Sequence, residues 1–221
     1  MSRYRLLALD IDGTIVNSRH ELGPHTQEAI LRAKSAGVEI VLATGRRYRR
    51  VLPLVESLEI AVPVVTTSGA LIKDPAGHRT LFRAGFEPSA LGQMLSLVNS
   101  RGYDPVVYCD TYHHGFDFYC LRTQVEQPEL SEFLARNAGD ERHWPDLITR
   151  PPADVFAGFA MGTRQQMLAL EAELERELGK HLYVHVLRSP RYTGFMCEIA
   201  PAGVSKWAGV LRLANQWGIS A

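Results

Sequence analysis

The sequence has no apolar run close to the roughly 20 residues that a membrane-spanning helix requires. Its first apolar segment follows the initial methionine almost at once and ends in an aspartate. That segment is too short and too acidic at its end for a secretory signal peptide. We therefore expect no membrane partner and no exported precursor.

Cysteine is also scarce, with three residues at Cys109, Cys120 and Cys197 and no C-x-x-C pair. An odd number of widely spaced cysteines indicates free thiols packed in strands rather than a disulfide framework. Free thiols are typical of a reducing compartment, so we expect a cytoplasmic protein.

Neither sign of charge is in excess, because 24 Lys and Arg residues balance 24 Asp and Glu residues. A nucleic-acid-binding protein normally has a basic excess or patch. The one basic cluster, residues 46–50 (RRYRR), is short, and we interpret it as the solvated face of a helix in preference to a nucleic-acid patch. We therefore expect no nucleic-acid partner.

The first third of the sequence alternates apolar strand patterns with helical patterns. Continuous apolar runs at residues 5–10, 38–43 and 62–66 predict buried parallel strands, the first of them central and covered on both faces. Helical spacing at residues 25–36 and 46–58 predicts the crossovers that join them. This order predicts an α/β fold with a parallel sheet.

The pattern changes after Gly69, where residues 70–82 have the composition of a hairpin. The predicted helices beyond it are residues 87–100, 127–137, 165–178 and 205–217, and the predicted strands are residues 106–109, 116–120, 155–161, 182–187 and 195–199. Such mixed segments predict a compact α+β module inserted into the α/β core, which resumes with the last helix.

Two aspartates, Asp10 and Asp12, end the first apolar run. Alternate strand residues face the same side, about 6.6 Å apart, so both carboxylates are expected at the sheet edge where α/β proteins bind ligands. Burial and like-charge repulsion oppose two ionised acids there, and a divalent cation would relieve the repulsion. A carboxylate and a backbone carbonyl of this segment suit Mg²⁺, and Gly13 permits the sharp turn that follows.

The second predicted strand ends in residues 43–46 (ATGR), which open a helix. The hydroxyl of Thr44, followed by Gly45 at a helix N-terminus, predicts a phosphate site because free amides and the helix dipole favour an anion. Lys206, at the start of the last helix, adds a compact positive charge. These groups suit phosphoryl transfer through an aspartyl-phosphate with Mg²⁺.

These segments resemble the motifs of the haloacid dehalogenase (HAD) superfamily of phosphatases. Residues 10–15 (DIDGTI) match its D-x-D-G-T signature, residues 43–46 its second motif and residues 203–206 (GVSK) its third. Residues 67–72 (TSGALI) and 198–206 (EIAPAGVSK) resemble segments of the Cof-type branch. The resemblance covers nearly the whole chain in matching order.

The resemblance implies a Rossmann-like HAD core at residues 1–82 and 191–221, with an inserted α+β cap at residues 83–190. It also implies roles. Asp10 would be the nucleophile and a Mg²⁺ ligand, and Asp12 would protonate the leaving oxygen, activate water and help hold the metal. The substrate-binding residues would be Gly13, Thr44, Gly45, Arg46 and Lys206, of which Thr44 and Lys206 would also contact the transferring phosphoryl group.

The family's fourth motif, G-D-x-x-N-D, is missing. It normally follows the helix of Lys206 and completes the metal site, whereas the sequence ends at Ala221. Residues 139–142 (GDER) lie in the predicted cap and lack the second acid. We favour a fragment of a longer protein over a metal site that is completed in another way.

The leading hypothesis is a Mg²⁺-dependent phosphatase of a small phosphorylated metabolite, such as a sugar phosphate. The alternative is a non-catalytic phosphate-ligand binding or regulatory protein, and a receiver domain fits less well because it has no inserted module. The oligomeric state is left open. His113 and His114 are interpreted as exposed turn residues rather than substrate contacts. His181 and His185, about 13 Å apart on a strand, are too far apart to share a metal ion.

Overall fold

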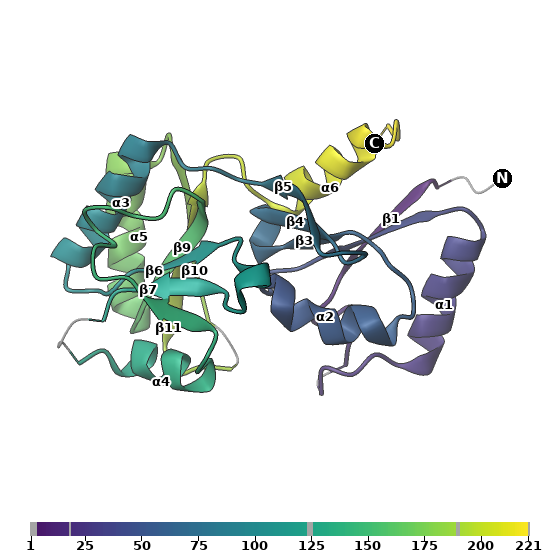
Figure 1. Ribbon diagram of the computed structural model, residues 1–221, viewed down its shortest axis with the longest axis horizontal. Helices are drawn as coiled ribbons and strands as arrows, with labels where there is room; N and C mark the ends of the chain where they lie inside the picture. Colours follow the sequence, from purple (N-terminus) through teal and green to yellow (C-terminus); the bar gives the residue numbers. More distant parts are fainter. Residues whose placement is uncertain (1–3, 18, 123–125, 189–190, 221) are drawn as a thin grey trace. The chain divides into compact units, whose positions relative to one another are not determined.

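The computed structural model describes residues 4–17, 19–122, 126–188 and 191–220. The chain divides into two compact units, Met1–Arg83 with Val204–Ala221 and Ala84–Gly203. The sequence colours of Figure 1 show that the first unit joins the purple start of the chain to its yellow last helix.

A five-stranded sheet forms the centre of the first unit. Its strands are β1 (Leu6–Asp10), β2 (Glu39–Ala43), β3 (Val64–Thr66), β4 (Leu71–Asp74) and β5 (Arg79–Arg83), in that spatial order. Its helices are α1 (Pro24–Ser35), α2 (Tyr48–Ser57) and α6 (Lys206–Gln216), and a 3₁₀ turn, η1 (Thr67–Gly69), follows β3. The first three strands pair in parallel and the last two continue the sheet in antiparallel fashion, which confirms the predicted α/β fold.

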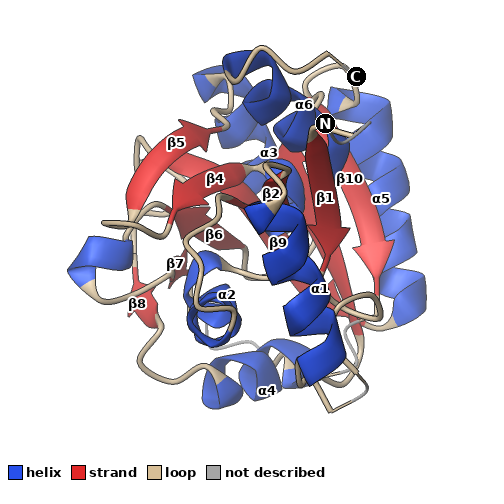
Figure 2. Cartoon of the chain, turned by 90° about the vertical axis from the view of Figure 1, so that its right-hand side faces the viewer, coloured by secondary structure: helices blue, strands red, loops and turns tan. Residues whose placement is uncertain are grey.

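Helices cover both faces of this sheet, as Figures 1 and 2 show. Ile40 and Leu42 of β2 share a buried cluster with Val51 of α2. Val41, which points to the other face, shares a second cluster with Val210 of α6. Because β2 is buried on both faces, its sequence is a continuous apolar run instead of an alternating pattern.

The first strand does not lie where the sequence predicts it. β1 is at the end of the described sheet and pairs there with β2 alone. Leu7 is 38% exposed, and Ala8 is exposed as well. The prediction of a central strand covered on both faces is therefore wrong for the described residues, because the apolar composition of a strand does not reveal how many neighbours it has.

The second unit contains a six-stranded sheet and three helices. The strands, in spatial order, are β10 (Leu182–Leu187), β11 (Phe195–Pro201), β9 (Val155–Gly162), β6 (Val106–Cys109), β7 (Phe118–Cys120) and β8 (Glu141–His143). The helices are α3 (Pro88–Ser100), α4 (Pro128–Arg136) and α5 (Arg164–Leu178), and a 3₁₀ turn, η2 (Tyr112–His114), follows β6. All strand pairs are antiparallel except β7 with β8.

Both faces of this second sheet are covered by helices. Met94 of α3 and Met167 of α5 pack in one cluster with Val107 of β6. Phe118 points to the opposite face, because its partner in the register is Tyr108, and there it contacts Phe133 of α4. The unit therefore has its own core.

Strand pairing sets the boundaries of the second unit. β11 pairs with both β9 and β10, so it belongs to this sheet. The sequence places the return to the first unit at residue 191, whereas the structure places it at Val204. β8 was not predicted, because its three residues, ERH, show no apolar alternation.

Cys109, Cys120 and Cys197 are buried in strands as thiols rather than as disulfides, as predicted. Burial raises the pKa of the Cys197 thiol to about 12. Among the described helices, none has the length and apolar composition needed to cross a membrane.

Candidate active site

The parallel register of the first unit brings the ends of its strands together. Asp10, the last residue of β1, is the register partner of Ala43, the last residue of β2. The amide of Thr44 then donates to the carbonyl of Val65 in β3 at 2.8 Å. The segments that follow these three strands therefore lie at one edge of the sheet, and they carry most of the predicted site residues.

A tight turn follows Asp10 directly. The buried Ile11 accepts hydrogen bonds at its carbonyl from the amides of Thr14, Ile15 and Val16, at 3.2–3.3 Å. Gly13 has a φ of +74°, a conformation that glycine adopts without steric cost. Asp12 consequently lies in the turn that follows β1.

Lys206 reaches Asp10 from the other end of the chain. Its Nζ lies 2.7 Å from Oδ1 of Asp10, and both side chains are about two-fifths exposed. Lys206 is the first residue of α6, and Ser205 caps this helix by accepting from the amide of Ala208 at 3.0 Å. Asp10 and Lys206, which lie near opposite ends of the chain, therefore meet as an ion pair at this edge of the sheet.

Two glycines allow α6 to approach the sheet edge. A Cβ on Gly69 would lie 2.2 Å from the carbonyl oxygen of Ser205, and a Cβ on Gly209 would lie 2.6 Å from Cγ1 of Val65. Any larger side chain at either position would push α6 away from β3. The two glycines therefore help to set where Lys206 stands.

Thr44 is buried at this edge, with 1% of its surface exposed. Its Oγ1 accepts from the amide of Arg46 at 3.1 Å, and its carbonyl accepts from the amide of Ser68 at 3.1 Å. The N-cap of α2 is Arg47, so Thr44 is not an ordinary helix cap. Since the amide occupies one lone pair, the hydroxyl hydrogen can still be donated to a ligand.

The η1 turn is unusual in its backbone. Thr67, Ser68 and Gly69 have φ values of +46°, +54° and +106°. Two consecutive non-glycine residues in this region are costly, and such strain tends to cluster at functional sites. The amide of Thr67 donates to the carbonyl of Arg46 at 3.0 Å, so η1 is tied to the loop that carries Gly45 and Arg46.

Arg46 forms a two-pronged ion pair with Asp12. Its Nε lies 2.9 Å from Oδ2 and its Nη2 lies 2.5 Å from Oδ1. The Arg46 side chain is only 14% exposed, whereas that of Asp12 is 48% exposed. His20 adds a contact that sequence reasoning missed, because its Nδ1 lies 3.2 Å from Nη2 of Arg46. No local motif singles out a histidine in the loop after the D-x-D-G-T segment.

Asp10 and Asp12 are the acids at this edge that could hold a cation. Mg²⁺ keeps several of its waters and often takes only one or two carboxylates from a protein, so this pair fits part of a Mg²⁺ site. Within the described residues there is no group of three or more His, Cys, Asp or Glu side chains that could hold a metal ion. The carboxylate of Asp10 and the backbone carbonyl of Asp12 could therefore supply part of a coordination shell.

The four histidines considered in the sequence analysis lie in the second unit. His113 and His114 are exposed on η2. His181 and His185 are also exposed, and Nδ1 of His181 lies 3.1 Å from Oε2 of Glu87.

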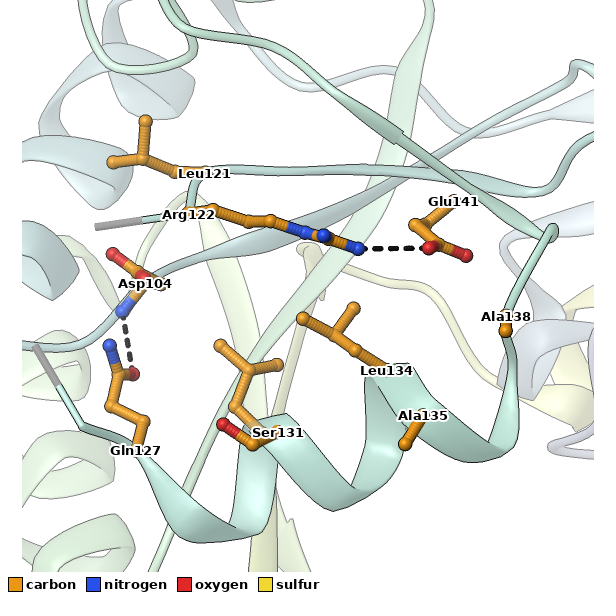
Figure 3. A pocket seen from close by; sticks show the side chains of 10 residues that line it. Asp104, Leu121, Arg122, Gln127, Ser131, Leu134, Ala135, Ala138 and Glu141 are labelled. Carbon is orange, nitrogen blue, oxygen red and sulfur yellow. Dashed lines mark hydrogen bonds and ion pairs between the residues drawn. The ribbon is translucent and has the colours of Figure 1, made fainter. Parts of the chain in front are cut away.

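The second unit also contains a pocket of about 400 Å³ between α4 and the strand region near β7 and β8 (Figure 3). The Arg122–Glu141 ion pair, 2.9 Å long, lines one side, and Leu134 and Ala135 of α4 line another. No predicted catalytic residue is among those that line it.

A model of the haloacid dehalogenase-like hydrolase family matches residues 7–221 of this chain. The chain belongs to this family. Among curated relatives, it is 33% identical over 99 residues to the phosphatase YwpJ of Bacillus subtilis, a match that covers 45% of this chain and 34% of YwpJ. It is 30% identical to the 5-amino-6-(5-phospho-D-ribitylamino)uracil phosphatase YwtE of the same species, over 97% of this chain and 78% of YwtE.

The matched part thus spans about a third of one HAD relative and about three-quarters of the other. A solved haloacid dehalogenase-like hydrolase from Bacteroides thetaiotaomicron has the same fold, with a TM-score of 0.74 and 22% identity. That match covers 99% of this chain and 79% of the other.

Proposed function

We propose that this protein is a Mg²⁺-dependent phosphatase that hydrolyses a small phosphorylated metabolite, such as a sugar phosphate, through an aspartyl-phosphate on Asp10. The observation that carries the proposal is the 2.7 Å pair between Asp10 and Lys206, at the sheet edge that also holds Thr44 and Asp12. Family membership and relatives that are named phosphatases support it.

The first chemical step is nucleophilic attack by Asp10. A carboxylate oxygen forms a bond to phosphorus while the bond from phosphorus to the ester oxygen breaks. The electron pair of the broken bond stays on the ester oxygen, which takes a proton from Asp12, so Asp12 enters this step as the neutral carboxylic acid and leaves it as the carboxylate. Lys206 pairs with Asp10 and lies near the charge that develops on the phosphoryl oxygens.

The second step regenerates Asp10. A water molecule attacks phosphorus and gives a proton to the Asp12 carboxylate, while the bond between phosphorus and Asp10 breaks. Inorganic phosphate leaves, and both aspartates return to their starting protonation states. The same Asp12 thus serves as an acid in one step and as a base in the next.

Thr44 holds the group that is transferred. Its hydroxyl hydrogen remains available for a phosphoryl oxygen, and the backbone that tethers it to Ser68 keeps it fixed. Gly45 leaves room beside it, since its nearest neighbour would be Oγ of Ser68 at 3.5 Å from an added Cβ. A fixed donor costs little reorganisation during the reaction.

The Mg²⁺ ion would be held by the carboxylate of Asp10 and the backbone carbonyl of Asp12. When bound, it neutralises charge on the phosphate and orients it for in-line attack. We propose the cytoplasm as the site of action, because three free buried thiols are typical of a reducing compartment.

The test is release of inorganic phosphate from a panel of small phosphate esters, with and without Mg²⁺, by the wild type and by Asp10→Asn. We expect Mg²⁺-dependent turnover that the substitution abolishes. Calorimetry with inorganic phosphate separates the alternative. Binding of phosphate without turnover by the wild type would contradict the proposal and support a non-catalytic binding protein.

A further inference from the structure

The loop after the Asp12 turn is folded into a tight turn by one side chain. Oδ1 of Asn17 accepts from the amides of Arg19, at 2.8 Å, and Glu21, at 3.0 Å. The backbone carbonyl of Asn17 accepts from the amide of His20 at 2.9 Å, and its amide donates to the carbonyl of Glu21 at 3.0 Å. His20 therefore lies at the tip of a closed turn.

The base of this turn is joined to the active-site turn. Val16 forms isolated bridges with both Asp12 and Leu22. His20 itself has a φ of +62°, in the left-handed region that few non-glycine residues adopt. Such an outlier persists only when the surrounding structure holds it, and it is a reason to ask what the side chain does there.

The His20 ring contacts the Arg46–Asp12 ion pair. Its Nδ1 lies 3.2 Å from Nη2 of Arg46 and 3.4 Å from Oδ1 of Asp12. A guanidinium group can only donate, so the contact with Arg46 makes Nδ1 the acceptor and places the ring hydrogen on Nε2. Nη2 carries two hydrogens, one for Oδ1 of Asp12 and one for His20.

The two-pronged pair fixes Arg46 and Asp12 relative to each other, but it does not tie either of them to the turn that carries His20. A second acceptor on Nη2 restricts rotation of the guanidinium group and so restricts the direction of the Asp12 carboxylate. Supporting contacts of this kind orient a reactive group without touching the substrate, and small misplacements of a catalytic group lower rates substantially.

We infer that His20 is a positioning residue: it accepts a hydrogen bond from Arg46 and thereby holds Asp12 in line for proton transfer to the leaving group. The inference rests on the proposed function, in which Asp12 is the acid. It assigns a task to a loop residue outside the family motifs.

Two variants of His20 separate this role from a purely structural one. His20→Ala removes the acceptor. His20→Asn keeps an amide oxygen near the position of Nδ1, and asparagine tolerates a positive φ. Arg19→Ala is the matched control, because Arg19 lies in the same turn and uses its backbone amide to close it.

The measurement is kcat/KM for an alkyl phosphate, glycerol 2-phosphate, and for 4-nitrophenyl phosphate, whose leaving group needs little protonation. For His20→Ala we expect a loss of roughly 10-fold on the alkyl ester and less than about 2-fold on the aryl ester, because only the former depends on a well-placed acid. His20→Asn should recover most of the loss, and Arg19→Ala should match the wild type. Equal losses on both esters, or no recovery with asparagine, would overturn the inference.

A second readout does not depend on turnover. In ¹⁵N NMR spectra we expect the His20 ring to carry its hydrogen on Nε2, and we expect His20→Ala to shift the side-chain resonances of Arg46 while Arg19→Ala leaves them unchanged. Unshifted Arg46 resonances in His20→Ala contradict the positioning role even in a protein that releases no phosphate. Absent turnover with shifted resonances would instead count against the phosphatase proposal alone.

Discussion

At the scale of single residues, each acid at the sheet edge has its own cation. Asp10 pairs with Lys206 and Asp12 pairs with Arg46. The two cations come from different elements and differ in chemistry. Lysine presents a compact point charge suited to a moving phosphoryl group, whereas the planar fork of arginine fixes the direction of a carboxylate.

Replacing Lys206 by methionine should reduce kcat strongly and leave stability nearly unchanged. Both partners of the Asp10–Lys206 pair are about two-fifths exposed, so its loss should change the free energy of unfolding by no more than about 1 kcal/mol. Loss of a charge aimed at the transition state should lower kcat by roughly 100-fold. Steady-state kinetics and urea unfolding measure the two effects.

Lys34→Met is the control for Lys206, since Lys34 forms a comparably exposed pair with Glu39 at 2.8 Å. It should leave kcat unchanged. A Lys206→Met protein with kcat within a few-fold of the wild type would show that Lys206 has no part in the reaction.

Some residues of the proposed site can be predicted from local sequence motifs, and others cannot. Asp10, Asp12 and Thr44 follow predicted strands directly. Because the carboxyl ends of parallel strands lie at one edge of a sheet, the local strand pattern is enough to predict that these residues lie close together. Lys206 is recognisable from the segment that precedes it. His20 cannot be predicted in this way. Its contact with Arg46 depends on the turn that Asn17 closes and on a positive φ at His20, and no sequence motif indicates either of them.

At the scale of elements, the site depends on how closely η1 and α6 approach. No residue with a side chain fits at position 69 without a shift of the backbone, since a Cβ added to Gly69 would lie 2.2 Å from the Ser205 carbonyl oxygen. Its φ of +106° is a second obstacle to any other residue. This close contact between Gly69 and Ser205 sets the position of the first residue of α6, which is Lys206.

Gly69→Ala should therefore lower both stability and activity. A strained backbone and an overpacked contact together should cost about 3 kcal/mol in the free energy of unfolding, and the displaced Lys206 should reduce kcat further. Denaturant titration and phosphate release check the two effects. Gly85→Ala is the control, because Gly85 has an ordinary φ and nothing within 4 Å of an added Cβ. Equal stability of the two variants would contradict the close approach.

Hydrophobic periodicity predicts most helices and strands correctly. It does not predict features that depend on which strands pair with each other. The continuous apolar runs of β2 and β3 and the helical spacing of α5 are visible in the sequence. The sequence does not predict β8, because its three residues have no apolar pattern. This strand is defined by its pairing with β7. The boundary expected at residue 191 is displaced because β11 pairs with β9, a contact between residues distant in sequence.

At the scale of the whole molecule, the chain folds as two units with separate cores. The motifs near the start and the end of the sequence meet in the first unit, while the intervening 84–203 segment forms the second. The sequence pattern indicates an inserted α+β module. It does not predict that β1 lies at the end of the described sheet, because an apolar run reports a preference for burial and not the number of its neighbours.

Phosphorylation of Asp10 during turnover distinguishes the proposed mechanism most directly. An acyl phosphate on an aspartate is reduced by borohydride to homoserine, which peptide mass spectrometry locates. We expect homoserine at position 10 when the protein is quenched with borohydride during turnover of a phosphate ester, and none without substrate. Turnover with an unmodified Asp10, or with the modification at another aspartate, would contradict it.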